Sequence, residues 1–248
     1  MKKLLTTLSI SLGSVILFST GAFAQGSEEI VQEGVTLEGF VENLEEEAKT
    51  SEEAQENLDK FHDLTDDEQS KLIDYLNDPT LFEEFVDVAS EPSTQSLQSL
   101  EEGTTVEDTK EFKNGDVVIR TESEVERVAP NDGEFSTMAY NYDWRATKHH
   151  YQGMFGIDTT KLSTYVDFDA SGKTVTRAVG QGYYHSNYNP GIGLSGRSGN
   201  RGVTAGNQAW AETFWTYTLM KYTGVQQTKR QTVYAHHQGA ITGGLENR

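Results

Sequence analysis

The chain has no cysteine among its 248 residues. That absence excludes disulfide frameworks, thiolate zinc sites, iron–sulfur clusters and cysteine nucleophiles. Basic residues are also few, because 20 lysines and arginines stand against 39 acidic residues and leave a net charge of -19. Binding to phosphate backbones needs a basic face, so this balance argues against a nucleic-acid partner.

Long hydrophobic runs are missing except near the N-terminus. Lys2 and Lys3 precede a mostly apolar stretch from Leu4 to Phe18, and residues 21–24 read Gly-Ala-Phe-Ala. A basic start, a short apolar middle and small residues at the end form the pattern of a cleavable secretory leader. The run is too short and too polar for a stable transmembrane span. We therefore expect residues 1–24 to be a signal peptide and the mature protein to be secreted and extracellular.

Catalytic signatures are equally scarce. The sequence holds no G-x-S-x-G elbow and no S-x-x-K pair. Residues Gly191–Gly196 match G-x-G-x-x-G, but the flanking sequence has the composition of a loop, whereas a dinucleotide site needs a strand before the motif and a helix after it. We therefore expect no cofactor and assign no catalytic residue. An enzyme stays open because Ser/His/Asp triads also assemble from distant residues.

Acidic residues divide the chain into two parts. Residues 25–103 carry 24 acids and 3 bases, a net charge of -21, whereas residues 104–248 carry 15 of each. All three tryptophans and ten of the eleven tyrosines lie beyond Thr137, where the net charge is +5. Two such compositions predict two structural units. We expect an acidic helical domain or prosegment at 25–90, a linker at 91–103 and a second domain at 104–248.

Apolar residues in the acidic part recur at three-to-four spacing, which predicts three or four short amphipathic helices. Thr65–Glu68 has the spacing of a capping box, and Thr80–Glu83 repeats it. Pro79 should end the helix between them, because the residue before proline is pushed out of helical geometry. Phe85 and Val86 should face inward from the last helix.

Beyond the linker the pattern alternates with a period of two, as in strands. The pair Asn114-Gly115 and the segment 169–172 predict hairpin turns. Residues 210–219 and 231–237 are further strand candidates. Five to eight strands separated by Gly/Asn turns predict an antiparallel all-β sandwich or barrel-like domain. The predicted fold class is therefore α+β, a small acidic helical segment followed by this β domain.

Residues 186–206 are rich in Gly, Ser and Asn, which predicts a long loop. Two guanidinium groups and flexible backbone amides there can bind an anion, or the segment is a solvated connection. Exposed aromatic side chains suit flat contacts with sugars, lipid headgroups or proteins, while packing in the sandwich core is the alternative. The candidate binding residues, surface aromatics and basic loop together, are Trp144, Tyr188, Arg197, Arg201, Trp210, Trp215 and Tyr217.

Histidines and aspartates give weaker signals. Adjacent histidines on a strand point to opposite faces, so each pair would offer one inward metal ligand, and no metal-binding spacing occurs. We assign no metal and leave open whether any of the following binds one: His149, His150, His185, His236 and His237. Asp167 and Asp169 are either a carboxylate pair or part of a hairpin, and turn geometry favours the hairpin.

These observations lead to three functional hypotheses. The first is a secreted antibacterial, bacteriocin-like protein whose aromatic β domain acts on bacterial cell surfaces while the acidic helices screen it. The second is a non-enzymatic secreted module that binds glycan or protein. The third is a secreted hydrolase whose pocket gathers His185 or His236 with Asp167, Asp169 or Glu212. The expected partner is the bacterial cell envelope or its wall glycan.

Overall fold

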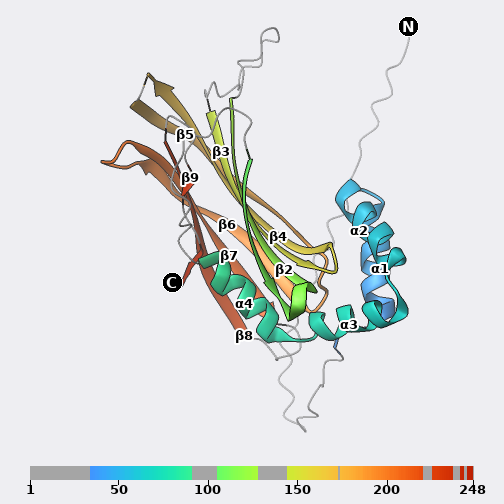
Figure 1. Cartoon of the computed structure of the whole chain (residues 1–248). Helices are drawn as coiled ribbons and strands as arrows, with labels where there is room; N and C mark the ends of the chain where they lie inside the picture. Colours follow the sequence, from blue (N-terminus) through green and yellow to red (C-terminus); the bar gives the residue numbers. More distant parts are fainter. Residues whose placement is uncertain are drawn as a thin grey trace, which may run out of the picture. The chain divides into compact units, whose positions relative to one another are not determined.

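The computed structural model describes residues 34–90, 105–127, 144–172, 174–219, 225–236, 241–242 and 245–247. Within these ranges, four helices precede two antiparallel sheets that pack together (Figure 1). The predicted α+β class and antiparallel sandwich are therefore confirmed. The expected leader at 1–24 and linker at 91–103 lie outside the described residues, so they and the domain boundaries stay predictions.

The four helices are α1 (Leu37–Ala48), α2 (Glu52–Asp63), α3 (Asp66–Leu76) and α4 (Pro79–Ser90). The first three start at a hydroxyl side chain, from Thr36, Ser51 and Thr65 respectively, that accepts a hydrogen bond from a backbone amide in the first turn. Such caps satisfy amides that no helical carbonyl reaches. The predicted capping box between Thr65 and Glu68 is confirmed.

The start of α4 differs from the prediction. The helix begins at Pro79, and the Asp78 carboxylate accepts a hydrogen bond from the Thr80 amide at 3.0 Å. The predicted box from Thr80 to Glu83 is therefore wrong, because proline suits the first helical position and the preceding aspartate supplies the cap. Phe85 and Val86 are buried as predicted.

The first sheet is a meander in which each strand pairs with its neighbours in sequence. Its turn at Asn114-Gly115 has φ angles of 63° and 95°, which confirms the predicted hairpin. Ser171 pairs with Thr174, so the second predicted hairpin is confirmed as well. The strands are β1 (Thr105–Phe112), β2 (Val117–Arg127), β3 (Trp144–Met154), β4 (Ile157–Ser171) and β5 (Thr174–Asn187).

The second sheet has the order β10-β8-β7-β6, with β9 paired to β8. Its strands are β6 (Ile192–Val203), β7 (Gln208–Leu219), β8 (Val225–His236), β9 (Ile241–Thr242) and β10 (Leu245–Asn247). The loop predicted at 186–206 is therefore wrong, because most of it forms β6. Glycine is favourable here because its neighbours are bulky: a Cβ on Gly196 would lie 2.5 Å from the Tyr183 ring and 2.7 Å from that of Trp215.

Three buried apolar clusters hold these elements together. The first joins α1, α2 and α3 to the ends of β2, β3 and β4. In the second, Phe82, Phe85 and Val86 of α4 pack against Trp215 and Tyr217 of β7, and Figure 1 shows α4 beside that sheet. The third cluster is formed by strands alone. The helices supply many of the buried side chains in the first two clusters, so they are a packed layer over the strands. Each buried large apolar side chain contributes about 1.5–3 kcal/mol to the stability of the fold.

A polar layer separates the second and third clusters inside the sandwich. The Gln231 carbonyl accepts hydrogen bonds from Trp215 Nε1 and Thr164 Oγ1, both at 2.7 Å. The Gln231 amide donates to the carbonyl of Lys148 at 3.2 Å. Lys148 and His150 are each only 1% exposed. Polar and ionisable side chains thus occupy the centre of the β interior, between two apolar ends.

Candidate functional site

The outer face of the second sheet carries a groove of about 560 Å³. Three alternate residues of β7, Trp210, Glu212 and Phe214, share this face, while Ala211 between them belongs to the third cluster and Thr213 is also buried. Two residues predicted to bind, Arg197 and Trp210, line the groove. Its lining is Arg197, Ser198, Gly199, Asn200, Trp210, Glu212, Phe214 and Arg230.

A bulge in β6 shapes one side of the groove. Ser198 pairs with Thr213 and Arg201 with Ala211, so Gly199 and Asn200 together stand opposite Glu212. A side chain at Gly199 would be too close to its neighbours, because a Cβ would lie 2.5 Å from Glu212 Cγ. The bulge therefore lets the Glu212 side chain pack against the backbone of β6.

The polar groups of the groove are held in fixed positions. Glu212 Oε1 accepts hydrogen bonds from the Asn200 backbone amide at 3.0 Å and from Asn200 Nδ2 at 3.1 Å. Arg230 Nη1 lies 3.6 Å from Glu212 Oε2, and the Arg197 guanidinium lies 4.6 Å from the centre of the Phe214 ring. The groove thus offers one carboxylate, two guanidinium groups and the indole of Trp210. Hydroxylated ligands with a flat apolar face, such as sugars, match this set.

Arg201 lies on the other face of β6 from Arg197. Directly paired residues share a face, and Arg197 pairs with Phe214 in the groove whereas Arg201 pairs with Ala211, which is buried in the third cluster. Four residues apart in a regular strand, the two arginines would share a face, but the extra residue of the bulge reverses the alternation. They therefore do not form the shared anion site that the sequence suggested.

Three of the predicted surface aromatics are buried. Tyr188, Trp215 and Tyr217 are 3%, 1% and 2% exposed, so the prediction that they face solvent is wrong. The Phe82 ring of α4 packs edge-on against Tyr217 at 4.9 Å, and Tyr188 belongs to the first cluster with α1, α2 and α3. Trp215 is covered edge-on by the rings of Tyr183 and His185 from β5. Trp144 is partly exposed but lies on β3 of the first sheet, with Arg127 over its ring at 5.9 Å. It is not part of the groove.

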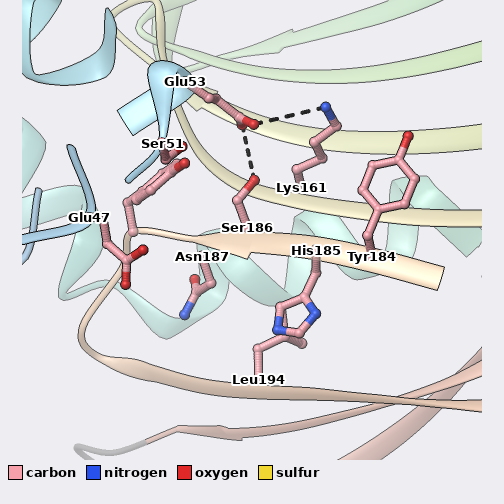
Figure 2. Close-up of a pocket in the computed structure, with 10 residues that line it drawn as sticks. Glu47, Ser51, Glu53, Lys161, Tyr184, His185, Ser186, Asn187 and Leu194 are labelled. Atoms are coloured by element: carbon pink, nitrogen blue, oxygen red, sulfur yellow. Dashed lines mark hydrogen bonds and ion pairs between the residues drawn. The ribbon is translucent and has the colours of Figure 1, made fainter. Parts of the chain in front are cut away.

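A second cavity, of about 470 Å³, lies where β5 meets α1 and α2 (Figure 2). Glu53 Oε1 accepts a hydrogen bond from Ser186 Oγ at 3.0 Å, and Glu53 Oε2 lies 4.0 Å from Lys161 Nζ. His185 also lines it, and burial lowers the pKa of this histidine. Sequence reasoning missed this cavity because its carboxylates come from helices more than one hundred residues before its strands.

The carboxylates considered for hydrolysis have other partners. Asp167 accepts two hydrogen bonds from Arg145, at 2.8 and 3.3 Å, and Asp169 binds Arg177 at 2.6 Å. Neither cavity brings His185 or His236 together with Asp167, Asp169 or Glu212. The constellation named for a hydrolase is therefore not assembled in the cavities described.

Within the described ranges, no group of three or more His, Asp or Glu side chains is arranged to hold a metal ion. His237 lies outside those ranges. The helices α1 to α4 are also too short and too polar to cross a bilayer.

Comparisons with protein-family models, curated proteins and solved structures found no match to this chain.

Proposed function

We propose that the protein is a secreted binding protein whose groove on the outer face of the second sheet takes a glycan of the bacterial cell wall. The observation that carries the proposal is the grouping of the Trp210 indole with Arg197, Arg230 and Glu212 on adjacent strands. Sugars are bound by an aromatic plane beside fixed donors and acceptors, and side chains on paired strands keep their geometry without ordering a loop. An extracellular glycan agrees with the secretory pattern of residues 1–24.

Sedimentation with insoluble cell-wall glycan tests this proposal. Wild type should sediment with the glycan, and Trp210→Ala should weaken binding at least ~30-fold, because a central aromatic contact is worth ~2 kcal/mol or more. Trp144→Ala is the matched control, since it removes a partly exposed tryptophan from the other sheet. If both variants bind like wild type, or wild type does not sediment, the groove is not a glycan site.

The arginines sharpen the same experiment. Arg197→Ala should weaken glycan binding, whereas Arg177→Ala, which removes an exposed arginine of the first sheet, should not. Equal losses from the two variants would indicate nonspecific attraction of cationic side chains to an anionic wall polymer. That result would contradict recognition by the groove.

A second candidate, antibacterial action with the acidic helices as a screen, is favoured by the second buried cluster. There α4 covers Trp215, Tyr217 and Leu219, in the part of the chain whose net charge is +5. Displacing α4 would uncover aromatic side chains that favour a membrane interface, and each nearby base adds about 1 kcal/mol of attraction to an anionic surface.

Dye release from anionic vesicles and killing of bacteria test this second candidate. The mass and N-terminal sequence of the secreted product show first whether the acidic segment persists. A form that lacks the segment should release dye, and added salt should reduce the release because it screens the attraction. If neither the intact nor the processed form kills at micromolar concentration, this function is excluded.

A further inference from the structure

Three polar side chains form a row across the outer face of the first sheet. His149 of β3 is paired directly with Ser163 of β4, and Ser163 Oγ lies 2.8 Å from His149 Nδ1. On the other side, His149 Nε2 lies 3.2 Å from Glu124 Oε1 of β2. A hydroxyl, an imidazole and a carboxylate are therefore linked in that order.

The electrostatics of the row favour one arrangement of protons. The hydrogen bond from His149 lowers the pKa of Glu124, and an ionised carboxylate accepts a hydrogen bond from the tautomer of His149 that carries its proton on Nε2. In that tautomer Nδ1 is the acceptor, and the Ser163 hydroxyl can donate to it. A serine beside a base that a carboxylate orients is the arrangement of an activated nucleophile, and it is recognised by geometry and not by sequence position.

An exposed tyrosine lies beside the buried Ser163. Ser163 is fully buried, whereas its register partner Tyr184 is 44% exposed, with its hydroxyl 3.4 Å from His149 Nδ1. Tyr184 also lines the 470 Å³ cavity shown in Figure 2. Tyr184 therefore lies between the row and the cavity, because it neighbours Ser163 on one side and lines the cavity on the other.

The cavity also carries one cationic side chain and several hydrogen-bond acceptors. Lys161 lines it and lies two residues before Ser163 on the same face of β4, with its ammonium 5.7 Å from the Tyr184 ring. A cation close to an attacked carbonyl stabilises the oxyanion that forms, and Lys161 is the candidate for that role in the proposal below. Glu47, Glu53 and Asn187 give the cavity hydrogen-bond acceptors, which suit a hydroxylated ligand.

We propose that Ser163 is the nucleophile of an esterase site, with His149 as its base and Glu124 as a positioning residue, and that the cavity takes a small ester of a polyhydroxylated alcohol. Ser163 Oγ attacks the ester carbonyl and its proton passes to His149 Nδ1. The carbon–oxygen bond of the ester then breaks, and His149 returns the proton to the departing alcohol. Water attacks the acyl-serine in the same way, which releases a carboxylic acid and restores the serine. This activity is independent of the glycan groove.

Labelling with a fluorophosphonate, followed by peptide mass mapping, tests the proposal on the full chain. The wild type should be modified at Ser163 and Ser163→Ala should not, while Ser195→Ala, which removes an exposed serine of the second sheet, should label like wild type. Tyr184→Ala should label at least ~10-fold faster because it opens the path from the cavity. Circular dichroism shows whether each variant is folded.

Glu124→Gln distinguishes a relay from a structural contact. Without the carboxylate, the labelling rate of the folded variant should fall at least ~10-fold, whereas Glu124→Asp keeps a carboxylate and should recover part of the rate. A rate unchanged in Glu124→Gln would remove Glu124 from the relay. If folded wild type and folded Tyr184→Ala both stay unmodified at Ser163, the hydrogen bonds are only structural and the proposal is overturned.

Discussion

His149 and His150 are neighbours in the sequence and lie on opposite faces of β3. On the outer face, His149 contacts the Glu124 carboxylate. On the inner face, His150 is almost completely buried, and its only described hydrogen bond joins Nδ1 to Thr121 Oγ1 at 3.0 Å. Among the described residues, the imidazole on the outer face therefore has a carboxylate beside it, whereas the imidazole on the inner face has a threonine hydroxyl.

The contrast extends along the whole strand. Outward-facing Arg145 pairs with Asp167, and the Arg120 guanidinium of the neighbouring strand lies over the Tyr151 ring at 4.1 Å. Inside, burial lowers the pKa of Lys148 to about 8, and burial lowers the pKa of His150 well below its ordinary value, helped by the charge of Lys148. The comparison shows that the arginines of the outer face lie beside a carboxylate or an aromatic ring, whereas burial inside the sandwich disfavours the charged forms of Lys148 and His150.

The largest expected effect concerns the apolar end of the interior. Phe85 of α4 is fully buried, so Phe85→Ala should lower the free energy of unfolding by about 3–5 kcal/mol. Leu37→Ala, at a residue that is 45% exposed, should change it by less than ~0.5 kcal/mol. Urea denaturation measures both values. Equal, small effects would mean that α4 lies on the sheets without forming part of their core.

Lys148 tests the cost of charge in the polar layer. Its folded pKa of about 8 lies below the ordinary 10.5, so the folded state disfavours the proton at neutral pH. Lys148→Met should raise the free energy of unfolding at pH 7 by about 1–3 kcal/mol. In wild type, stability should rise between pH 8 and pH 10.5, and this rise should disappear in the variant. A less stable Lys148→Met would show that the ammonium stabilises the interior.

His150 tests the same layer on the acid side. Because its folded pKa is below 6.5, the unfolded chain binds the proton more tightly, and stability should fall as the pH drops below 6.5. His150→Gln keeps a polar side chain without a titrating group and should flatten this part of the profile. Thermal unfolding between pH 7.5 and pH 5 measures the difference. Parallel profiles would place the acid sensitivity elsewhere.

The smallest effect is expected on the outer face. Glu124 has a 43% exposed side chain, so Glu124→Gln should lower the free energy of unfolding by no more than ~1 kcal/mol. Comparing the changes in the free energy of unfolding in Glu124→Gln and Lys148→Met sets a contact on the outer face against a buried lysine. A loss of several kcal/mol would mean that the outer row is as critical to folding as the interior.

Local features of the fold were predictable from the sequence. The capping box at Thr65, the hairpin at Asn114-Gly115 and the inward face of α4 depend on residues within a few positions of each other. The failures came where distant segments decide. Glycine-rich β6 forms a strand because β7 offers it a backbone ladder and aromatic rings to cover. Trp215 is buried because Tyr183 and His185 of β5 pack against it in the cluster that α4 completes.

The sequence by itself determined the α+β order of elements, the helix caps, the turns and the uneven distribution of charge, since each depends on local conformational preference or on composition. Only the tertiary structure decided that Arg197 and Trp210 share a groove while Arg201 does not, and that Ser163, His149 and Glu124 meet. These groupings depend on strand register and on one bulge. A shift of a single residue reverses which face a side chain occupies, and no local pattern in the sequence records that shift.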